Sequence, residues 1–236
     1  MNITIFTDAW DPQINGVVTT LKATIKQLEK KGYEVTVVHP DLFGVKVPLQ
    51  PSTGIWMPLS HVPKVYDEVK NAGHIHIATE GAIGLAARQA CAKYERQYTT
   101  SFHTKYPEYL YEHAYIPPRI TSLYFRWFHR DSSSVMVPTP AMVDYCSQMG
   151  IRNVTLWSRG VNTDLFKPDP DFKRQGVIRA VYVGRVSVEK NLEAFLSINN
   201  SSIVKYVIQM LSFSDVSLRM TLLAFYKRWT FLHGPL

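Results

Sequence analysis

Two cations beside a glycine turn are the residues of this sequence with the clearest chemistry. The apolar segment Ala180–Val183 is followed by Gly184 and Arg185. Lys190 opens a predicted helix that runs to Leu196. A helix N-terminus carries unpaired N–H groups, so cations near it favour a phosphate or a diphosphate. The unit therefore predicts a phosphate-binding enzyme. Because such a unit usually opens a domain and only 40 residues follow Leu196, it also suggests an incomplete domain.

Polar residues and a glycine follow several apolar segments that are predicted to be strands. They are Asp8, Asn15 and Gly16 after the first segment, Glu80 after the third, His103 and Thr104 after the fourth, and Arg159 after the sixth. In an open parallel sheet, ligands bind in the crevice beyond the carboxyl ends of the strands. These residues therefore predict a cleft lined for a polar ligand, although any sheet needs turns at its edge.

Three of these residues have both a chemical and a structural interpretation. His103 would contact a reacting group, whereas single histidines are more often structural. Gly16 would let the backbone approach a phosphate, or it is an ordinary turn glycine. Glu80 would bind hydroxyl groups or cap the next helix. The sequence has no G-x-G-x-x-G, which counts against a nicotinamide or flavin cofactor.

Metal and disulfide chemistry is not indicated. His74 and His76 alternate along one strand face without a third ligand at suitable spacing, so we predict no metal site there. Cys91 and Cys146 lie in helical segments and form no metal or disulfide framework. We interpret them as reduced thiols in a reducing compartment.

Short apolar segments alternate with longer helical patterns along the chain. The predicted strands are Ile3–Phe6, Val35–Val38, Ile75–Ala78, Tyr98–Phe102, Ser134–Val137, Val154–Leu156 and Ala180–Val183. The predicted helices are Val17–Lys31, Lys64–Asn71, Gly84–Tyr94, Arg119–His129, Ala141–Met149 and Lys190–Leu196. This alternation predicts an α/β fold with a Rossmann-like, doubly wound parallel sheet, followed by an incomplete second domain of the same kind.

The stretch Phe166–Asp171 is rich in Pro and Asp and is predicted to be a linker. We therefore expect a first domain over residues 1–172, the start of a second over 173–196, and an atypical tail over 197–236.

The segment Arg119–Arg130 predicts an amphipathic helix that is both aromatic and basic. One face carries Ile120, Leu123, Tyr124, Trp127 and Phe128, and a flank carries Arg119, Arg126 and Arg130. The pattern suits an interfacial helix on anionic lipid, with Trp127 and the arginines in contact. The alternative, which we prefer, is a helix packed on the sheet with solvated arginines.

Composition limits the partners. The formal charge of +7 favours an anionic partner, and a nucleotide, an acidic lipid and nucleic acid all qualify. Because the basic residues form no known basic–aromatic nucleic-acid motif, we expect no nucleic acid. The chain opens without a basic leader and has no apolar run long enough to span a bilayer. We expect a cytoplasmic protein, peripheral on the inner face of the cytoplasmic membrane if the interfacial helix contacts lipid.

Taken together, these residues resemble glycosyltransferase family 4, whose members have the two-domain GT-B architecture. The resemblance covers residues 1 to about 196 and rests on Thr7–Thr20, His76–Gly81, Ser101–Thr104, Pro107–Tyr109, Trp157–Phe166, Gly184–Arg185 and Glu189–Asn191. It is closest to bacterial members that glycosylate lipids such as diacylglycerol or phosphatidylinositol, or that use GDP-mannose.

The resemblance implies a retaining hexosyltransferase. It would move a hexose or hexuronic acid from a GDP- or UDP-linked sugar to a lipid or glycan acceptor, without a metal or other cofactor. By similarity, Gly16 would approach the donor diphosphate, Arg185 and Lys190 would neutralise the leaving group, and His103 would touch the transferred sugar. Asp8, Asn15, Glu80, Thr104 and Arg159 would contact the acceptor or line the cleft. The alternative is a non-catalytic sugar- or lipid-binding module that retains only the acceptor half.

Residues 197–236 depart from the family pattern. The family should supply further strand–helix units with a glycine-rich loop and two glutamates, whereas this tail has one acid, Asp215, and no glycine before Gly234. We expect the tail to be out of register with the family, with a genuine divergent lobe as the alternative. We also expect the strand Ala180–Val183 to lack neighbours along its edges, and the chain to be an inactive fragment.

Overall fold

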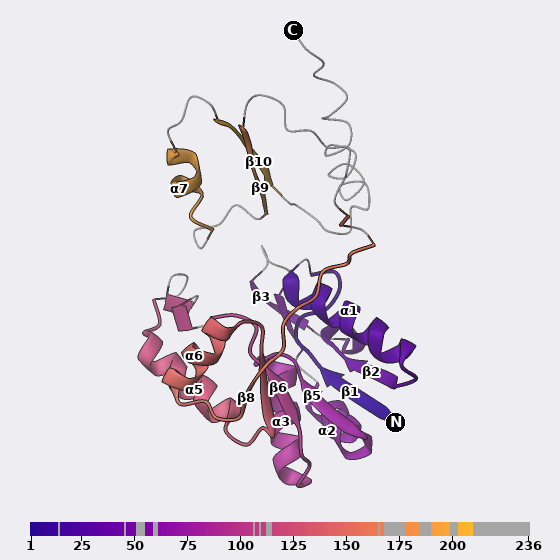
Figure 1. Cartoon of the computed structure of the whole chain (residues 1–236). Helices are drawn as coiled ribbons and strands as arrows, with labels where there is room; N and C mark the ends of the chain where they lie inside the picture. Colours follow the sequence, from indigo (N-terminus) through magenta and orange to yellow (C-terminus); the bar gives the residue numbers. More distant parts are fainter. Residues whose placement is uncertain are drawn as a thin grey trace. The chain divides into compact units, whose positions relative to one another are not determined.

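The computed structural model describes residues 1–13, 15–44, 46–50, 55–58, 61–105, 107–108, 110–111, 115–164, 166–167, 178–184, 190–198 and 203–209. The chain divides into two compact units, Met1–Gly160 and Val161–Leu236. Figure 1 shows the elements of each unit. The predicted boundaries at residues 172 and 196 remain predictions.

Six parallel strands form the sheet of the Met1–Gly160 unit. They are β1 (Asn2–Phe6), β2 (Glu34–Val38), β5 (His74–Ile77), β6 (Thr99–Ser101), β7 (Ser134–Val137) and β8 (Val154–Leu156). Their order is β2-β1-β5-β6-β7-β8, and every neighbouring pair is parallel. The predicted parallel α/β fold is therefore confirmed, and each of these strands lies within two residues of its predicted bounds.

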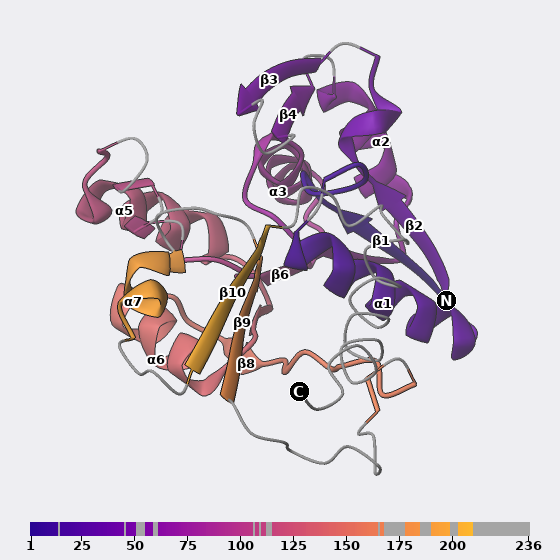
Figure 2. The same cartoon turned by 90° about the horizontal axis from the view of Figure 1, so that it is seen from above.

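Helices cover both faces of this sheet. They are α1 (Gly16–Lys30), α2 (Val62–Asn71), α3 (Ala82–Lys93), α5 (Pro118–His129) and α6 (Pro140–Met149). Successive residues of a strand point to opposite faces. Ile5 packs with Leu21 of α1, whereas Phe6 packs with Val65 of α2 and Ile83 of α3. Figure 2 shows α1 on one side of β1 and α2 and α3 on the other.

The helix ends follow from local side-chain chemistry. Asn15 caps α1, because its Oδ1 accepts hydrogen bonds from the N–H groups of Val17 and Val18, both at 3.0 Å. Thr139 caps α6 by accepting from the N–H of Met142 at 3.3 Å. Gly150 ends α6 with a φ of 83°, a left-handed conformation that favours glycine.

A small hairpin was not predicted. Its strands β3 (Lys46–Gln50) and β4 (Ile55–Pro58) pair in antiparallel orientation, with an irregularity between Pro48 and Gln50. A short 3₁₀ helix, η1 (Pro40–Leu42), follows β2. Proline lacks the N–H of a ladder donor and is confined to edges and bulges, so a segment that contains prolines is a weak strand signal.

The second unit contains β9 (Ile178–Gly184), α7 (Leu192–Ser197) and β10 (Ile203–Gln209). β9 and α7 lie within two residues of the predicted strand and helix. The expectation that the strand Ala180–Val183 lacks neighbours is wrong, because β10 pairs with β9 in parallel along its whole length. The partner strand comes from residues 203–209, which lie within the predicted atypical tail.

The face that α5 turns toward the sheet also differs from the prediction. Its buried residues are Thr121, Phe125, Phe128 and His129. Ile120 and Leu123, predicted to share a face with Phe128, are 60% and 57% exposed. The helix is packed on the sheet, as we preferred, but it keeps a second apolar surface.

Candidate functional site

The chain crosses from one half of the sheet to the other between β1 and β5. After β1 it continues to the edge strand β2, and it returns to β5 on the opposite side of β1. Ligands of open α/β sheets bind beyond the carboxyl ends of the strands at such a switch point. The segments that follow β1, β5, β6 and β8 therefore define the candidate site.

Asp8 fills the crevice at the switch point. Its Oδ1 accepts a hydrogen bond from the N–H of Ile83 at 2.8 Å, and its Oδ2 accepts from Thr79 Oγ1 at 2.8 Å and the N–H of Gly84 at 3.4 Å. Burial raises the pKa of the Asp8 carboxyl above its usual range, although these hydrogen bonds oppose the shift. The carboxylate thus occupies the N-terminus of α3, where an anionic ligand would otherwise bind.

Gly81 makes this arrangement possible. A Cβ atom at this position would lie 2.5 Å from Asp8 Cγ, which is closer than atoms of this kind approach one another. Asp8 is therefore the carboxylate that caps α3. The sequence had left Glu80 as the alternative cap of this helix.

Glu80 is buried and pairs with a histidine. Its Oε1 lies 3.3 Å from Nε2 of His129, and the other ring nitrogen, Nδ1, lies 2.8 Å from Thr100 Oγ1. Thr100 donates its single hydroxyl hydrogen to Ser132 Oγ at 3.2 Å, so Nδ1 of His129 must donate to Thr100. Burial raises the pKa of Glu80, and the hydrogen bond to His129 opposes this shift. The buried carboxyl group is thus held by the protein itself.

Glu80 also accepts a hydrogen bond on its backbone carbonyl from Tyr124 Oη, at 2.6 Å. Tyr124 and His129 both belong to α5, so this helix holds the segment after β5 at two points. The assignment of Asp8 and Glu80 to an acceptor remains a prediction.

His103, Arg159 and Gly16 come together at the carboxyl edge. Arg159 Nη2 donates to His103 Nδ1 at 2.9 Å. A Cβ atom on Gly16 would lie 3.5 Å from Arg159 Nη1, so the start of α1 adjoins the guanidinium. The ring of Trp157 lies 6.2 Å from the His103 ring, measured between centroids.

The contact with Arg159 fixes the state of His103. Burial and the Arg159 charge lower the pKa of His103 to about 3, so the ring is neutral at physiological pH. Because Nδ1 accepts from Arg159, the single proton resides on Nε2. That Nε2–H is buried and has no hydrogen-bond partner among the residues that the structure describes. An unpaired buried donor costs about 1–3 kcal/mol, and a ligand acceptor would remove that cost.

The other predicted site residues are placed less specifically. Asn15 Nδ2 donates to Gln13 Oε1 at 3.2 Å, and its Oδ1 caps α1. Thr104 is half-buried and follows His103. Arg185 lies outside the described residues. Lys190 is exposed, belongs to the other unit and precedes Asn191, the N-cap of α7.

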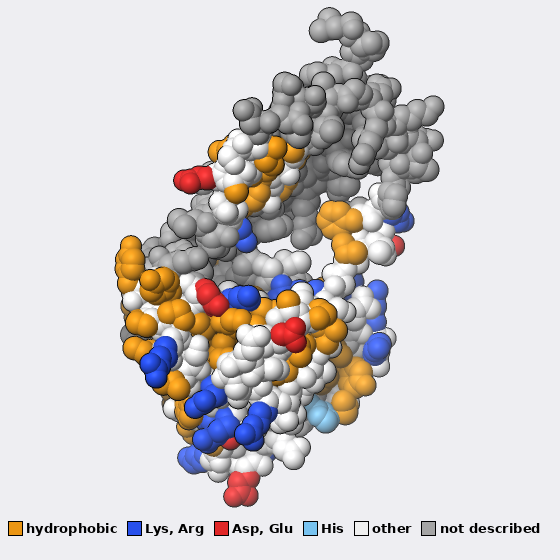
Figure 3. Space-filling view, turned by 60° about the vertical axis from the view of Figure 1, so that its left-hand side comes forward, with side chains coloured by type: hydrophobic (Ala, Val, Ile, Leu, Met, Phe, Trp, Pro, Cys, Tyr) orange, Lys and Arg blue, Asp and Glu red, His pale blue; other side chains and the backbone are white. Residues whose placement is uncertain are grey.

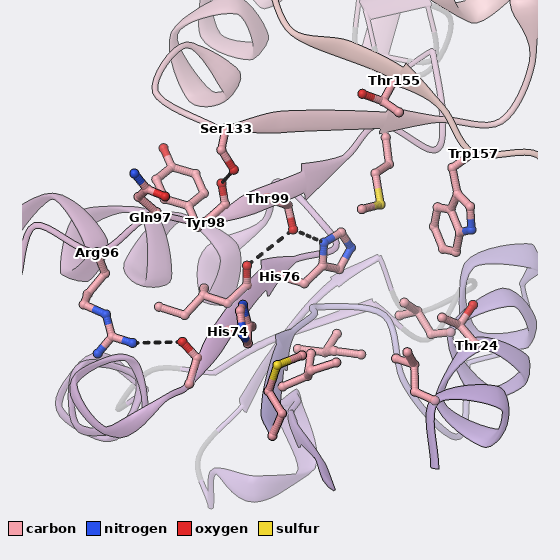
Figure 4. Close-up of a pocket in the computed structure, with 18 of the residues that line it drawn as sticks. Thr24, His74, His76, Arg96, Gln97, Tyr98, Thr99, Ser133, Thr155 and Trp157 are labelled. Carbon is pink, nitrogen blue, oxygen red and sulfur yellow. Dashed lines mark hydrogen bonds between the residues drawn. The ribbon is translucent and has the colours of Figure 1, made fainter. Parts of the chain in front are cut away.

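His74 and His76 line a groove on the α1 face of the sheet, with a volume of about 710 Å³. The close-up in Figure 4 shows the His76 ring beside Thr99 and Trp157 beyond it. His76 Nδ1 lies 2.9 Å from Thr99 Oγ1 and Nε2 lies 2.9 Å from Ser101 Oγ, so both ring nitrogens have protein partners. Within the described ranges, no group of three His, Cys, Asp or Glu side chains could hold a metal ion. Metal independence remains a prediction.

Sequence reasoning missed the pair of Glu80 and His129, and it missed Trp157 as a neighbour of His103. His129 is 49 residues from Glu80, so no local pattern links them. The position of Trp157 could have been predicted, since it directly precedes Ser158 and Arg159 in a segment that follows a strand.

Comparisons with known proteins agree with this geometry. The model of Glycosyltransferase Family 4 matches residues 14–165. A GDP-mannose-dependent alpha-mannosyltransferase of Corynebacterium glutamicum is 25% identical over 88% of this chain and 57% of its own length. The alpha-monoglucosyldiacylglycerol synthase of Streptococcus pneumoniae is 22% identical over 83% of this chain and 51% of its own length. The chain thus spans a little more than half the length of these relatives.

Solved structures show the same fold at low identity. Sucrose-phosphate synthase from Thermosynechococcus elongatus matches 97% of this chain and 68% of its own length, with a TM-score of 0.58 and 12% identity. An alpha-glucosyltransferase in complex with UDP and DNA matches 94% of this chain and 70% of its own, with a TM-score of 0.56 and 11% identity.

The matched residues include Asn15, Gly16, Glu80, His103 and Arg159, and the sheet has the strand order and carboxyl-edge site derived above. The chain therefore belongs to glycosyltransferase family 4 and shares the α/β fold of GT-B glycosyltransferases.

Proposed function

We propose that this chain carries the acceptor-binding half and the beginning of the donor-binding half of a retaining glycosyltransferase. The enzyme would move a hexose or a hexuronic acid from a GDP- or UDP-linked sugar to a membrane lipid such as diacylglycerol or phosphatidylinositol. Support comes from relatives named for GDP-mannose and for glucosyldiacylglycerol, and from a sulfoquinovosyl transferase of Arabidopsis thaliana that is 24% identical.

The observation that carries this proposal is the unpartnered Nε2–H of His103. It is a neutral donor, held in place through Nδ1 by Arg159, at the carboxyl edge of the sheet. A sugar hydroxyl is a suitable acceptor for such a donor. Because the ring carries no charge at pH 7, it would orient the sugar without repelling the positive charge that develops at the anomeric carbon.

Arg159 and Gly16 would contact the diphosphate of the donor, whereas His103 would contact its sugar. Burial lowers the pKa of Arg159 below its usual range, yet a guanidinium stays protonated in proteins. It therefore supplies a fixed positive charge beside the N-terminus of α1, where Gly16 offers no side chain to obstruct a diphosphate.

Departure of the nucleoside diphosphate builds negative charge, which Arg185 and Lys190 would neutralise in place of a metal ion. In the reaction, the bond between the anomeric carbon and the diphosphate oxygen breaks and a bond to the acceptor oxygen forms. The acceptor proton leaves with the diphosphate. Retention would need no nucleophile from the protein, and we assign none.

The test compares two proteins in the presence of EDTA. One is the 236-residue chain, and the other is a chimera in which the corresponding part of the C. glutamicum relative follows Leu196. Each is incubated with GDP-mannose or UDP-glucose and with diacylglycerol or phosphatidylinositol. We expect the chimera to form an α-linked glycolipid and to lose on the order of tenfold or more of its rate with Lys190→Ala or His103→Ala.

Outcomes of this experiment separate the alternatives. Acceptor binding by both proteins, without transfer by either, would favour a non-catalytic lipid-binding module. A wild-type rate in the chimera with Lys190→Ala would remove the diphosphate assignment and leave the role of His103 standing.

A further inference from the structure

The outward face of α5 carries a continuous apolar stripe. Ile120, Leu123 and Trp127 are spaced at three and four residues, so they align along one side of the helix, and Ile116 lies in the segment that precedes it. In this order, their side chains are 60%, 57%, 38% and 38% exposed. The buried residues Phe125 and Phe128 lie on the opposite side and pack on the sheet. One helix thus has two apolar faces, and only the inner one is covered by described residues.

Arginines flank this stripe. Arg119, Arg126 and Arg130 are exposed and spaced at seven and four residues, which places them on one flank of the outer face. The helix sequence from Pro118 to His129 contains no acidic residue. Figure 3 shows hydrophobic and basic side chains side by side on this face of the molecule.

Acidic groups near the flank are already engaged. Asp131 pairs with Arg88 at 2.6 Å and with Arg130 at 3.0 Å, and Glu108 accepts from Tyr145 Oη at 2.7 Å. Arg119 and Arg126 line a groove of about 380 Å³ between α5 and α6, and Glu108 lines it as well. The two guanidinium groups outnumber this one carboxylate, so the groove has a net positive charge.

The outer face is held rigidly. Arg88 of α3 donates to the backbone carbonyls of Phe128 at 3.0 Å and Trp127 at 3.2 Å, at the C-terminus of α5. The guanidinium also lies 3.9 Å from the centroid of the Trp127 ring. Tyr124 anchors the middle of the helix to the carbonyl of Glu80. Because α5 is already folded and anchored by these contacts, the apolar stripe needs no folding step when it binds.

We propose that the α5 ridge, defined as Ile116, Ile120, Leu123 and Trp127 with Arg119, Arg126 and Arg130, lies on an anionic lipid bilayer. An apolar stripe beside a positive flank is complementary to the boundary between acyl chains and anionic headgroups. No described helix is long and apolar enough to cross a membrane, so this contact is parallel to the surface. The inference goes beyond the proposed function, because binding to a bilayer requires neither a donor nor transfer.

The first test measures sedimentation of the 236-residue chain with vesicles of phosphatidylcholine alone or with about a third phosphatidylglycerol. We expect binding only to the anionic vesicles, and weaker binding as salt is raised. Arg119→Gln with Arg126→Gln should weaken binding roughly 30-fold, since each basic residue near the surface contributes about a factor of five. Ile120→Ser with Leu123→Ser should weaken it about tenfold.

The matched control is Lys26→Gln with Lys30→Gln, two exposed positions on α1. This pair removes the same charge from a different surface and should change affinity by less than about threefold. Equal losses in the two charge variants would show that only net charge matters, and the proposal would be wrong. Equal binding to both kinds of vesicle would overturn it as well.

The second test locates the contact. Cys91 and Cys146 are free but buried, so a cysteine introduced at an exposed position can be labelled selectively. A polarity-sensitive dye on Leu123→Cys should shift to shorter wavelength with anionic vesicles, whereas the same dye on Lys26→Cys should not. A shift of the Leu123 dye that depends on protein concentration and occurs without vesicles would identify a second copy of the chain as the partner, and would contradict the bilayer.

Discussion

At the scale of single residues, the two buried carboxylates of the site have different roles. Asp8 caps α3 through two backbone N–H groups and also accepts from Thr79, whereas Glu80 is hydrogen-bonded to His129. Both lie where the sequence predicted ligand-binding groups, yet both are engaged by the protein. They fix the segments after β1 and β5, whereas the Nε2–H of His103 has no hydrogen-bond partner among the described residues.

Asp8→Asn should destabilise the fold. The side-chain amide of asparagine accepts hydrogen bonds only through its oxygen atom. Its NH₂ group would therefore face a backbone N–H of α3, which places two donors against each other. We expect a loss of about 2 kcal/mol in the free energy of unfolding, measured by urea denaturation. Asp11→Asn is the control, because Asp11 is exposed and pairs only with exposed Lys22 among the contacts described. Equal effects of the two substitutions would refute the capping role.

His103 should make the stability depend on pH. Its folded-state pKa of about 3 lies below the ordinary 6.5, so the unfolded chain binds more protons between these values. Stability is therefore fully present above pH 6.5 and decreases as the pH falls toward 3. His76, with a pKa lowered to about 4, acts in the same direction.

The measurement is urea denaturation at pH values between 7 and 4. His103→Asn should reduce the slope of stability against pH by about one proton, or ~1.4 kcal/mol per pH unit. The double variant with His76→Asn should be flatter still. An unchanged slope in His103→Asn would mean that the ring is not held neutral in the folded protein.

The sequence allowed part of this site to be predicted. Gly16, His103 and Arg159 follow strands, and the geometry of a parallel sheet brings strand ends together. The partners of Asp8 and Glu80 were not predictable, because they depend on the distance between α3, α5 and the sheet. That distance is set by side-chain packing rather than by local pattern.

At the scale of elements, close packing of α3 on β5 requires a glycine. A Cβ atom on Gly84 would overlap the carbonyl oxygen of Thr79. Gly84→Ala should therefore push α3 away from the strand end and disturb the cap formed by Asp8. We expect a loss of about 3 kcal/mol in thermal or urea unfolding.

Gly44→Ala serves as the comparison, since a Cβ there meets no atom within 4 Å. It should leave stability within about 0.5 kcal/mol of wild type. A similarly small effect of Gly84→Ala would show that α3 has room to shift.

Strands and helices with clear periodicity were predictable to within two residues. The hairpin of β3 and β4 was not, because its prolines resemble turn signals. β10 was not predicted, although Ile203–Gln209 is rich in the β-branched and aromatic residues that favour strands. The outward face of α5 was misassigned, since periodicity finds an apolar face but cannot say which of two is buried.

At the scale of the whole molecule, the chain divides between Gly160 and Val161 into two compact units. Limited trypsin digestion should cleave first after Lys173 or Arg174, since these sites follow the six-stranded unit and a stretch rich in Pro and Asp. Mass spectrometry should then find a stable fragment that begins at Met1. Earlier cleavage after Lys30 or Lys93, at the ends of α1 and α3, would contradict two separate units.

We propose that the Nε2–H of His103 donates a hydrogen bond to the sugar of a nucleotide donor. Nuclear magnetic resonance of the ¹⁵N-labelled imidazole tests it most directly, because the method detects binding even in the millimolar range. At pH 7 we predict a neutral ring with its proton on Nε2. GDP-mannose or UDP-glucose should shift that Nε2–H signal saturably, and GDP or UDP alone should shift it less. A charged ring, or an Nε2–H signal that no nucleotide sugar moves, would contradict the account.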